Sequence, residues 1–227
     1  PAFALRKRAV SIIGLDRYVA DGILTEEQAE FLRRAVRERQ NIVIAGGTST
    51  GKTTLANALL AEIAATGDRV LVLEDTVELQ CAARDHVSLR TRAGVVSMAE
   101  LVRATMRLRP DRVIVGEVRG GEALDLIKVW GTGHPGGIAT IHASSAHGAL
   151  LRLEQLILEV ALTPPRALIA EAVNVVVFIA GRGRARHVQT IARVASFDGH
   201  GYQLDDALVP PLPTLSLPSS TSSGELP

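Results

Sequence analysis

Gly46-Gly47-Thr48-Ser49-Thr50-Gly51-Lys52-Thr53-Thr54 is the segment from which the rest of the chain can be interpreted. It has a glycine, four further residues and then Gly-Lys-Thr, which is the spacing of a phosphate-binding loop. The apolar, β-branched run 41–45 precedes it and predicts a buried parallel strand. Residues 54–65 follow, rich in alanine and leucine and without glycine or proline, and predict a helix. A strand, a glycine-rich turn and a helix in that order let backbone N–H groups face a bound phosphate.

The residues of this 46–54 loop have different chemical uses at a phosphate site. The glycines let the backbone close around the anion, and the N–H groups at the helix start point toward it. Lys52 would reach the β- and γ-phosphates of a nucleotide, and the Thr53 hydroxyl would bind Mg²⁺. We expect the Lys52 side chain to lie outside the hydrophobic core. The alternative is a glycine-rich turn with a surface lysine, which requires neither the strand nor the helix.

Composition limits the fold class. The chain has 227 residues, of which 47% are hydrophobic and only 3% aromatic, so its core must be aliphatic. Such a core suits a mainly parallel sheet flanked by helices, in one large domain or one domain with appendages. The net charge of +1 argues against a general nucleic-acid-binding surface. Cys81 is the single cysteine, so the chain has no intrachain disulfide or cysteine-rich metal site, which fits a reducing cytoplasm.

Two further predicted strands end in carboxylates. Residues 69–73 lead to Glu74, and residues 112–116 lead to Glu117. Ligands of open α/β sheets bind at the carboxyl edge of the strands, and we expect both strands to flank the strand that enters the 46–54 loop. Glu117 would hold Mg²⁺ or its water shell, or polarise the attacking water, and Glu74 would orient or deprotonate that water. The alternative is that both carboxylates belong to ordinary polar turns.

Two histidines bracket the next predicted strand, 138–141. His134 lies in the glycine-rich loop 131–137, and His142 follows the strand directly. Near a nucleotide site, either ring could contact the γ-phosphate and report its presence, and His142 is the stronger candidate. The alternatives are a purely structural role for each ring, or a metal site for which no further ligands follow at a suitable spacing.

The remaining segments predict helices, a hairpin and a tail. Capping boxes at Thr25 and Ser97 each indicate a helix start. Residues 173–180 and 185–194 predict a C-terminal β-hairpin, whose arginine-containing turn should be solvated. Proline and serine dominate the last residues, which predicts a disordered tail. The expected division is a linker or remnant of a missing N-terminal domain in 1–24, one domain in 25–207 and the tail in 208–227.

Four elements, in their order and spacing, resemble the secretion and pilus traffic ATPases. They correspond to that family's Walker A motif, Asp box, Walker B motif and His box, and comprise the 46–54 loop, 73–79, 115–120 and 133–143. Within the family, segments 79–83, 108–112 and 133–137 are similar to the conjugal-transfer branch.

The resemblance implies a RecA-like P-loop NTPase core that hydrolyses ATP with Mg²⁺ and works as a homo-oligomeric ring, normally a hexamer. It implies a cytoplasmic motor, peripheral at the inner membrane, with inner-membrane components of a type IV secretion or conjugation channel as partners. We predict no direct sequence-specific binding of nucleic acid. Two other functions remain open. One is a P-loop kinase, although no arginine-rich lid is evident, and the other is a nucleotide-gated binding module, against which Glu74 and Glu117 argue.

Arginines between the Asp box and Walker B motif suggest how the site could be completed. Hydrolysis benefits from extra positive charge on the γ-phosphate, and the loop itself supplies only Lys52. Arg90 and Arg92 follow a short strand predicted at 87–89 and share a face of an extended segment. We expect them to act on the nucleotide of a neighbouring subunit, with Arg119 as the next candidate. Surface ion pairs are the alternative.

Overall fold

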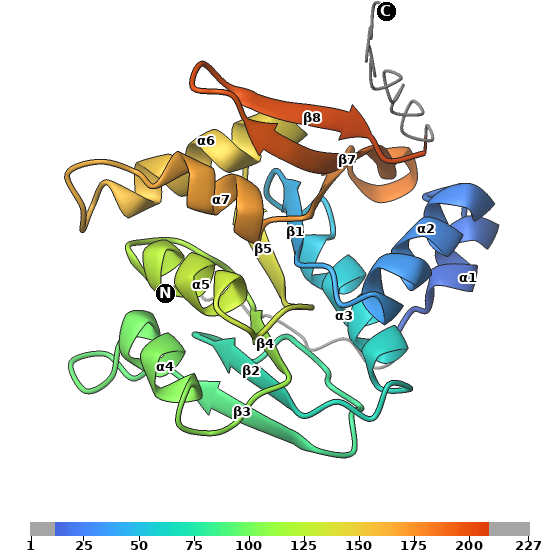
Figure 1. The fold of residues 1–227 in the computed structure, drawn as a ribbon. Helices are drawn as coiled ribbons and strands as arrows, with labels where there is room; N and C mark the ends of the chain where they lie inside the picture. The colour runs from blue at the N-terminus through green and yellow to red at the C-terminus, as the bar shows by residue number, and fades with distance from the viewer. Residues whose placement is uncertain (1–11, 209–227) are drawn as a thin grey trace, which may run out of the picture.

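The computed structural model describes residues 12–208. In this part of the chain a central sheet lies between two layers of helices, with α1, α2 and α3 on one face and α4, α5, α6 and α7 on the other (Figure 1). The helices are α1 (Leu15–Ala20), α2 (Glu26–Arg37), α3 (Lys52–Ile63), α4 (Met98–Thr105), α5 (Glu122–Gly131), α6 (Ala146–Ile157) and α7 (Arg166–Ala172). The strands are β1 (Ile42–Gly46), β2 (Val70–Glu74), β3 (His86–Arg90), β4 (Arg112–Val115), β5 (Ile138–His142), β6 (Val175–Ala180), β7 (His187–Phe197) and β8 (Tyr202–Asp206).

The sheet is mainly parallel, as the sequence predicted. Its strand order is β3-β2-β4-β5-β1-β6-β7-β8. The first six strands in this order pair in parallel, and β7 and β8 add antiparallel pairs at one end. The predicted C-terminal hairpin is confirmed as β6 and β7, but β8 extends it to three strands. The short strand predicted at 87–89 is confirmed within β3.

The expectation that the two carboxylate strands flank the loop strand is wrong. β1 lies between β5 and β6, whereas β4 lies beyond β5, and β2 lies beyond β4. The order of parallel strands depends on how the crossover helices pack on the two faces, and no local sequence pattern encodes it. On the side of the two carboxylate strands, the neighbour of the loop strand is therefore β5, and the parallel register sets His142 opposite Gly46.

The core is aliphatic and divided by the sheet into two clusters. All five residues of β1 are buried, and the four that precede Gly46 alternate between the clusters. Val43 and Ala45 pack with the α4–α7 layer, and Ile42 and Ile44 pack with the α1–α3 layer. This double coverage explains why the strand is a continuous apolar run.

Both predicted capping boxes are present. The Thr25 hydroxyl accepts the backbone N–H of Gln28 at 3.1 Å, the Gln28 side chain accepts the backbone N–H of Thr25 at 3.0 Å, and Ser97 forms the equivalent pair at α4. Helix α1 was not predicted. Its Leu15 and Tyr18 are each only 1% exposed and belong to the same cluster as α2 and α3. The predicted tail from residue 209 onward lies outside the described residues.

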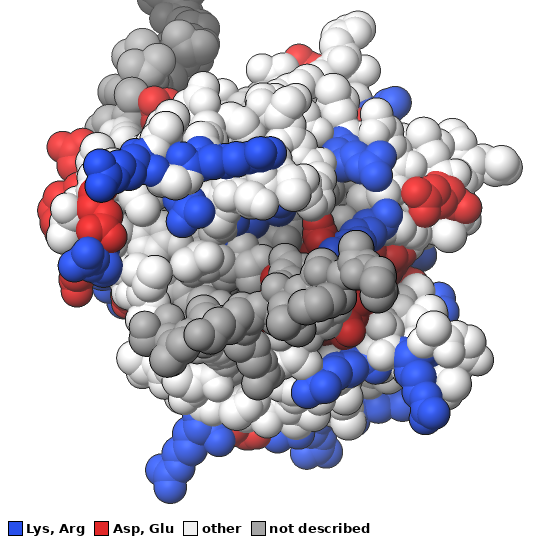
Figure 2. All heavy atoms as spheres, turned by 180° about the vertical axis from the view of Figure 1, so that it is seen from behind, with Lys and Arg blue, Asp and Glu red and all other residues white. Residues whose placement is uncertain are grey.

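The described surface carries charges of both signs. Figure 2 shows lysine and arginine side chains on the same face of the molecule as aspartate and glutamate side chains. Within residues 12–208, no helix is both long enough and apolar enough to cross a membrane.

Candidate active site

A cavity of about 510 Å³ lies at the carboxyl edge of the parallel strands. The residues of the 46–54 loop that line it are Thr48, Ser49, Gly51, Lys52, Thr53 and Thr54. Glu74, Glu117 and His142 line the same cavity, from β2, the turn after β4 and the end of β5. Residues from distant parts of the sequence therefore meet at one cavity, as expected of the carboxyl edge of an α/β sheet.

Glycines and one threonine set the backbone shape of the 46–54 loop. A Cβ at Gly46 would lie 2.5 Å from the carbonyl oxygen of Ile179 in β6, so only glycine fits there. The Thr50 hydroxyl donates to the carbonyl of Gly47 at 3.0 Å. Gly51 has φ +99°, a conformation that glycine adopts without strain, and it leads directly into α3.

Lys52 lies in the cavity wall. It belongs to neither hydrophobic cluster, as expected, yet it is only 7% exposed. Its ammonium donates to the carbonyl of Gly47 at 3.0 Å and lies 3.4 Å from Nδ1 of His142. Burial lowers the pKa of Lys52, and the nearby Glu117 carboxylate opposes this shift.

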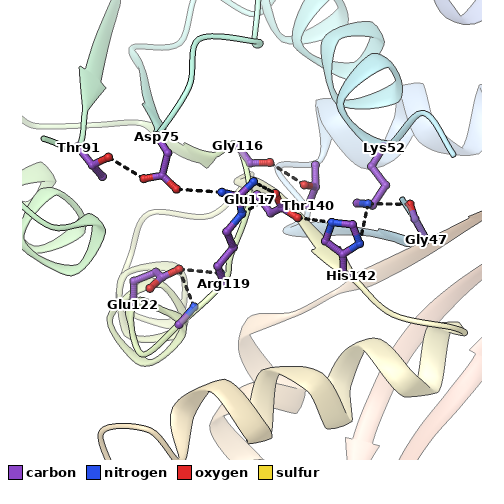
Figure 3. A network of polar contacts seen from close by, with 11 residues as sticks. Gly47, Lys52, Asp75, Thr91, Gly116, Glu117, Arg119, Glu122, Thr140 and His142 are labelled. Atoms are coloured by element: carbon purple, nitrogen blue, oxygen red, sulfur yellow. Dashed lines mark hydrogen bonds and ion pairs between the residues drawn. The ribbon is translucent and has the colours of Figure 1, made fainter. Parts of the chain in front are cut away.

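The ring of His142 lies between Lys52 and Glu117 (Figure 3). An ammonium can only donate, so Nδ1 of the ring is the acceptor and Nε2 carries the proton. Nε2 lies 2.6 Å from Oε1 of Glu117. Burial and the charge of Lys52 lower the pKa of His142, so the ring is neutral near pH 7.

Arg119 holds the other oxygen of Glu117. Its Nε donates to Oε2 of Glu117 at 2.7 Å, and its Nη1 lies 3.5 Å from Oδ2 of Asp75. The hydrogen bond to Glu117 raises the pKa of Arg119 further. The Glu122 carboxylate accepts the backbone N–H of Arg119 at 2.7 Å and so holds this turn at the start of α5. Oε2 of Glu117 is thus held by Arg119, while Oε1 faces Nε2 of His142.

Glu74 is a fixed carboxylate at the end of β2. It is 4% exposed, and its Oε1 accepts the backbone N–H groups of Glu78 at 2.9 Å and Leu79 at 2.7 Å. A Cβ at position 116 would lie 3.2 Å from Cγ of Glu74, so Gly116 leaves room for the side chain to enter the cavity wall.

Arg90 and Arg92 do not line this cavity. Both are exposed, and Arg90 lies at the end of the edge strand β3, opposite Glu74 in the parallel register. It lines a second cavity of about 400 Å³, to which Glu74 also contributes. His134 is remote from both cavities, and its Nδ1 lies 2.8 Å from the carbonyl oxygen of Pro110.

Thr140 and Arg186 are among the cavity residues that sequence analysis did not single out. The Thr140 hydroxyl donates to the carbonyl of Gly116 at 2.6 Å and ties β5 to the turn that carries Glu117. Arg186 lines the cavity from the connection between β6 and β7. Arg182 and Arg184 of that turn are exposed, as expected, whereas Arg186 is half-buried. Only the clustering of arginines there could have drawn attention to it.

The protein side chains alone do not make a complete metal site. Among residues 12–208, no three His, Cys, Asp or Glu side chains are grouped closely enough to hold an ion. Mg²⁺ commonly takes one or two protein ligands and completes its shell with water and phosphate oxygens. The Thr53 hydroxyl in the cavity wall suits this pattern. Arg119 and the His142 ring already contact the two carboxylate oxygens of Glu117. Glu117 is therefore better placed to contact the water shell of the metal than the ion itself.

Comparison with known proteins gives consistent matches. Residues 3–182 match the family described as type II/IV secretion system protein. The chain is 51% identical over 207 residues to the conjugal transfer protein TrbB of Rhizobium radiobacter, covering 90% of this chain and 64% of that protein. It is 39% identical over 178 residues to the type IV secretion system protein PtlH of Bordetella pertussis, covering 71% and 52%. It therefore spans less than two thirds of the length of either relative.

A solved structure shows the same fold. The VirB11 ATPase from the Brucella suis type IV secretion system, in complex with sulphate, superposes with a TM-score of 0.65 at 31% identity. The match covers 85% of this chain and 66% of that one. The predicted RecA-like α/β fold class is thereby confirmed.

Proposed function

The chain belongs to the type II/IV secretion system protein family, and from this premise we propose that it is a Mg²⁺-dependent ATPase that powers type IV secretion or conjugal transfer. One observation carries the proposal: Lys52 and Thr53 of the 46–54 loop share a cavity with Glu74, Glu117 and His142. This combination provides a cation for a phosphate, a hydroxyl for a metal ion and carboxylates for an attacking water.

Binding of ATP would use the 46–54 loop. The N–H groups of the loop and of the first turn of α3 would surround the phosphates. Lys52 would exchange the Gly47 carbonyl for phosphate oxygens, and these negative charges would raise its lowered pKa again. Its ammonium would then neutralise charge that builds up on the β–γ bridge.

Hydrolysis would depend on the carboxylates. The fixed Glu74 would orient or deprotonate the attacking water. Thr53 would hold Mg²⁺, which neutralises phosphate charge, and Glu117 would contact the water shell of the ion. His142 lies between Lys52 and Glu117 and would detect the γ-phosphate through its ring nitrogens.

The wider assembly is proposed from the relatives. TrbB is named a conjugal transfer protein, and VirB11 and PtlH are named type IV secretion proteins. We place this chain likewise in a homo-oligomeric ring, normally a hexamer, at the cytoplasmic face of the inner membrane, with inner-membrane channel components as partners. Arg90 on the exposed edge strand and Arg92 beyond it would then face a neighbouring subunit.

The test is phosphate release with ATP and Mg²⁺ as the sole additions. Wild type should turn over, and Lys52→Ala should lose turnover by about 10³-fold or more, as expected for a cation on the transferred phosphoryl group. Lys128→Ala is the matched control, because Lys128 is exposed on α5 outside the cavity. Turnover that needs an added acceptor would instead indicate a kinase. Binding with negligible turnover would indicate a nucleotide-gated module.

A further inference from the structure

Arg186 is a cation of the cavity that the proposed mechanism does not use. It comes from the connection between β6 and β7 and lies against the 46–54 loop. A Cβ at Gly51 would be 2.9 Å from Nε of Arg186 and 3.0 Å from its Cζ. The guanidinium therefore packs on the backbone of the residue that immediately precedes Lys52.

The turn that carries Arg186 is tightly constrained. Gly181 has φ +71°, and a Cβ there would lie 2.0 Å from the carbonyl oxygen of Ala185, so only glycine allows the chain to fold back at this point. The short 3₁₀ turn Gly183–Ala185 follows, and the backbone N–H of Arg186 donates to the carbonyl of Gly183 at 3.3 Å. The position of Arg186 is thus set by the backbone of the turn.

The guanidinium of Arg186 has no ion-pair partner within residues 12–208, and its Nε is buried without a hydrogen-bond partner. The nearby Tyr18 offers no counter-charge, because burial raises the pKa of its hydroxyl to about 12, against the opposing effect of Arg186. Arg119, the other arginine of the cavity, is by contrast paired with Glu117 and Asp75. An unpaired guanidinium beside a phosphate-binding backbone favours an anion there.

Arg186 and the proposed catalytic groups enter the cavity from opposite sides of β1. Glu74 ends β2, Glu117 follows β4 and His142 ends β5, all on one side of β1 in the strand order, whereas Arg186 comes from the β6–β7 side. The attacking water and the γ-phosphate belong with the carboxylates and His142. The N–H groups of a loop of this kind surround the α- and β-phosphates, and Arg186 packs on this backbone at Gly51.

We propose that Arg186 binds the α- and β-phosphates of the nucleotide held by its own chain, an inference that rests on the proposed function. These phosphates are present in ATP, in the transition state and in ADP. Arg186 therefore strengthens the binding of ATP, of the transition state and of ADP, and its effect on the chemical step is limited to the charge that builds up on the leaving β-phosphate. This separates it from an arginine that acts on the γ-phosphate, whose effect appears in kcat.

The experiment compares Arg186→Gln with wild type in equilibrium binding of ATP and ADP and in steady-state hydrolysis. Arg184→Gln, in the same turn and exposed, is the matched control. Loss of a charge-assisted phosphate contact should raise both dissociation constants by roughly 10- to 100-fold and by similar factors. KM should rise in parallel, kcat should stay within about twofold of wild type, and Arg184→Gln should behave as wild type. Arg186→Lys should recover part of the affinity.

Two results would overturn the proposal in a wild type that binds and hydrolyses ATP. One is an unchanged ADP affinity in Arg186→Gln, and the other is a fall in kcat without loss of ADP binding. If thermal melting shows that Arg186→Gln is unfolded, Arg186→Lys decides. A lysine cannot contact both phosphates with a planar fork as the arginine would, so an ADP affinity less than about threefold below wild type would contradict the proposed contact. A wild type that binds neither nucleotide would refute the proposed function itself.

Discussion

Replacing Glu74 by glutamine should remove turnover while preserving the fold and the affinity for Mg·ATP. The carboxylate is 4% exposed and accepts two backbone N–H groups, from Glu78 and Leu79, at 2.9 and 2.7 Å. Glutamine is nearly isosteric and keeps one carbonyl oxygen that can accept both. It cannot take a proton from water, so the variant tests the chemistry with little change in shape.

The expected loss of rate and the expected loss of stability can be told apart by their size. A positioned general base contributes about 10²–10⁴ in rate, or about 3–5 kcal/mol of transition-state stabilisation. Each hydrogen bond to a charged acceptor is stronger than a neutral one by about 1 kcal/mol, so Glu74→Gln should cost about 2 kcal/mol of unfolding free energy. Glu74→Ala would leave both N–H groups without an acceptor, at about 2–6 kcal/mol. That variant would confuse loss of fold with loss of chemistry.

The assay is single-turnover hydrolysis with enzyme in excess, together with equilibrium binding of Mg·ATP and urea unfolding. Glu117→Gln is the comparison, because it also removes a charge from the cavity but loosens the partners His142 and Arg119. It should weaken both binding and turnover. A Glu74→Gln rate within about tenfold of wild type would refute the role of Glu74 as base. The reverse pattern in the two variants would exchange their roles.

Three further predictions test other parts of the structure. His142→Ala should make the oligomeric state measured by sedimentation respond equally to ATP and ADP, and an equal response already in wild type would contradict phosphate sensing by this ring. Mixing inactive Lys52→Ala with inactive Arg90→Ala/Arg92→Ala should restore some turnover if these arginines act on a neighbouring subunit; mixed rings that remain inactive would refute this. Asp68→Asn should lower the free energy of unfolding in urea at pH 7 by about 3–5 kcal/mol. The substitution removes the carboxylate that pairs with the guanidinium of Arg112, which is only 1% exposed and would be left without a counter-charge. Burial opposes ionisation of Asp68, but hydrogen bonds from that arginine and a threonine hold its pKa below the usual value. The stabilisation is therefore present above about pH 4 and lost as the pH falls through the folded pKa, so an Asp68→Asn penalty that did not shrink at acid pH would contradict this explanation.

Much of the local structure could be predicted because its causes are local. The side chains of Thr25 and Gln28 each accept a hydrogen bond from the backbone N–H of the other residue, within the first turn of α2. The spacing of the two residues in the sequence is enough to predict this capping box. The run leading into the 46–54 loop is apolar because both faces of β1 are covered, and the glycines of the loop serve close approach and positive φ. Such features follow from the backbone chemistry of a few neighbouring residues.

Other elements were missed because their local signals are weak. Helix α1 is a single short helix of six residues, and it is stable through burial of Leu15 and Tyr18 against α2 and α3 rather than through propensity. Strand β8 has exposed residues along most of its length and pairs only with β7, so its composition resembles that of a polar loop.

The sequence by itself determined the loop, its strand and helix, the carboxylates at the ends of two strands and the family. Only the tertiary structure decided which strands are neighbours: it placed His142 beside Gly46, moved Glu74 to the third strand from β1, and brought Arg186 onto Gly51. The physical reason is the separation along the chain over which each interaction acts. Periodicity, capping and glycine spacing act within a few residues, whereas strand order and the approach of one turn to another result from the packing of helices on both faces of the sheet.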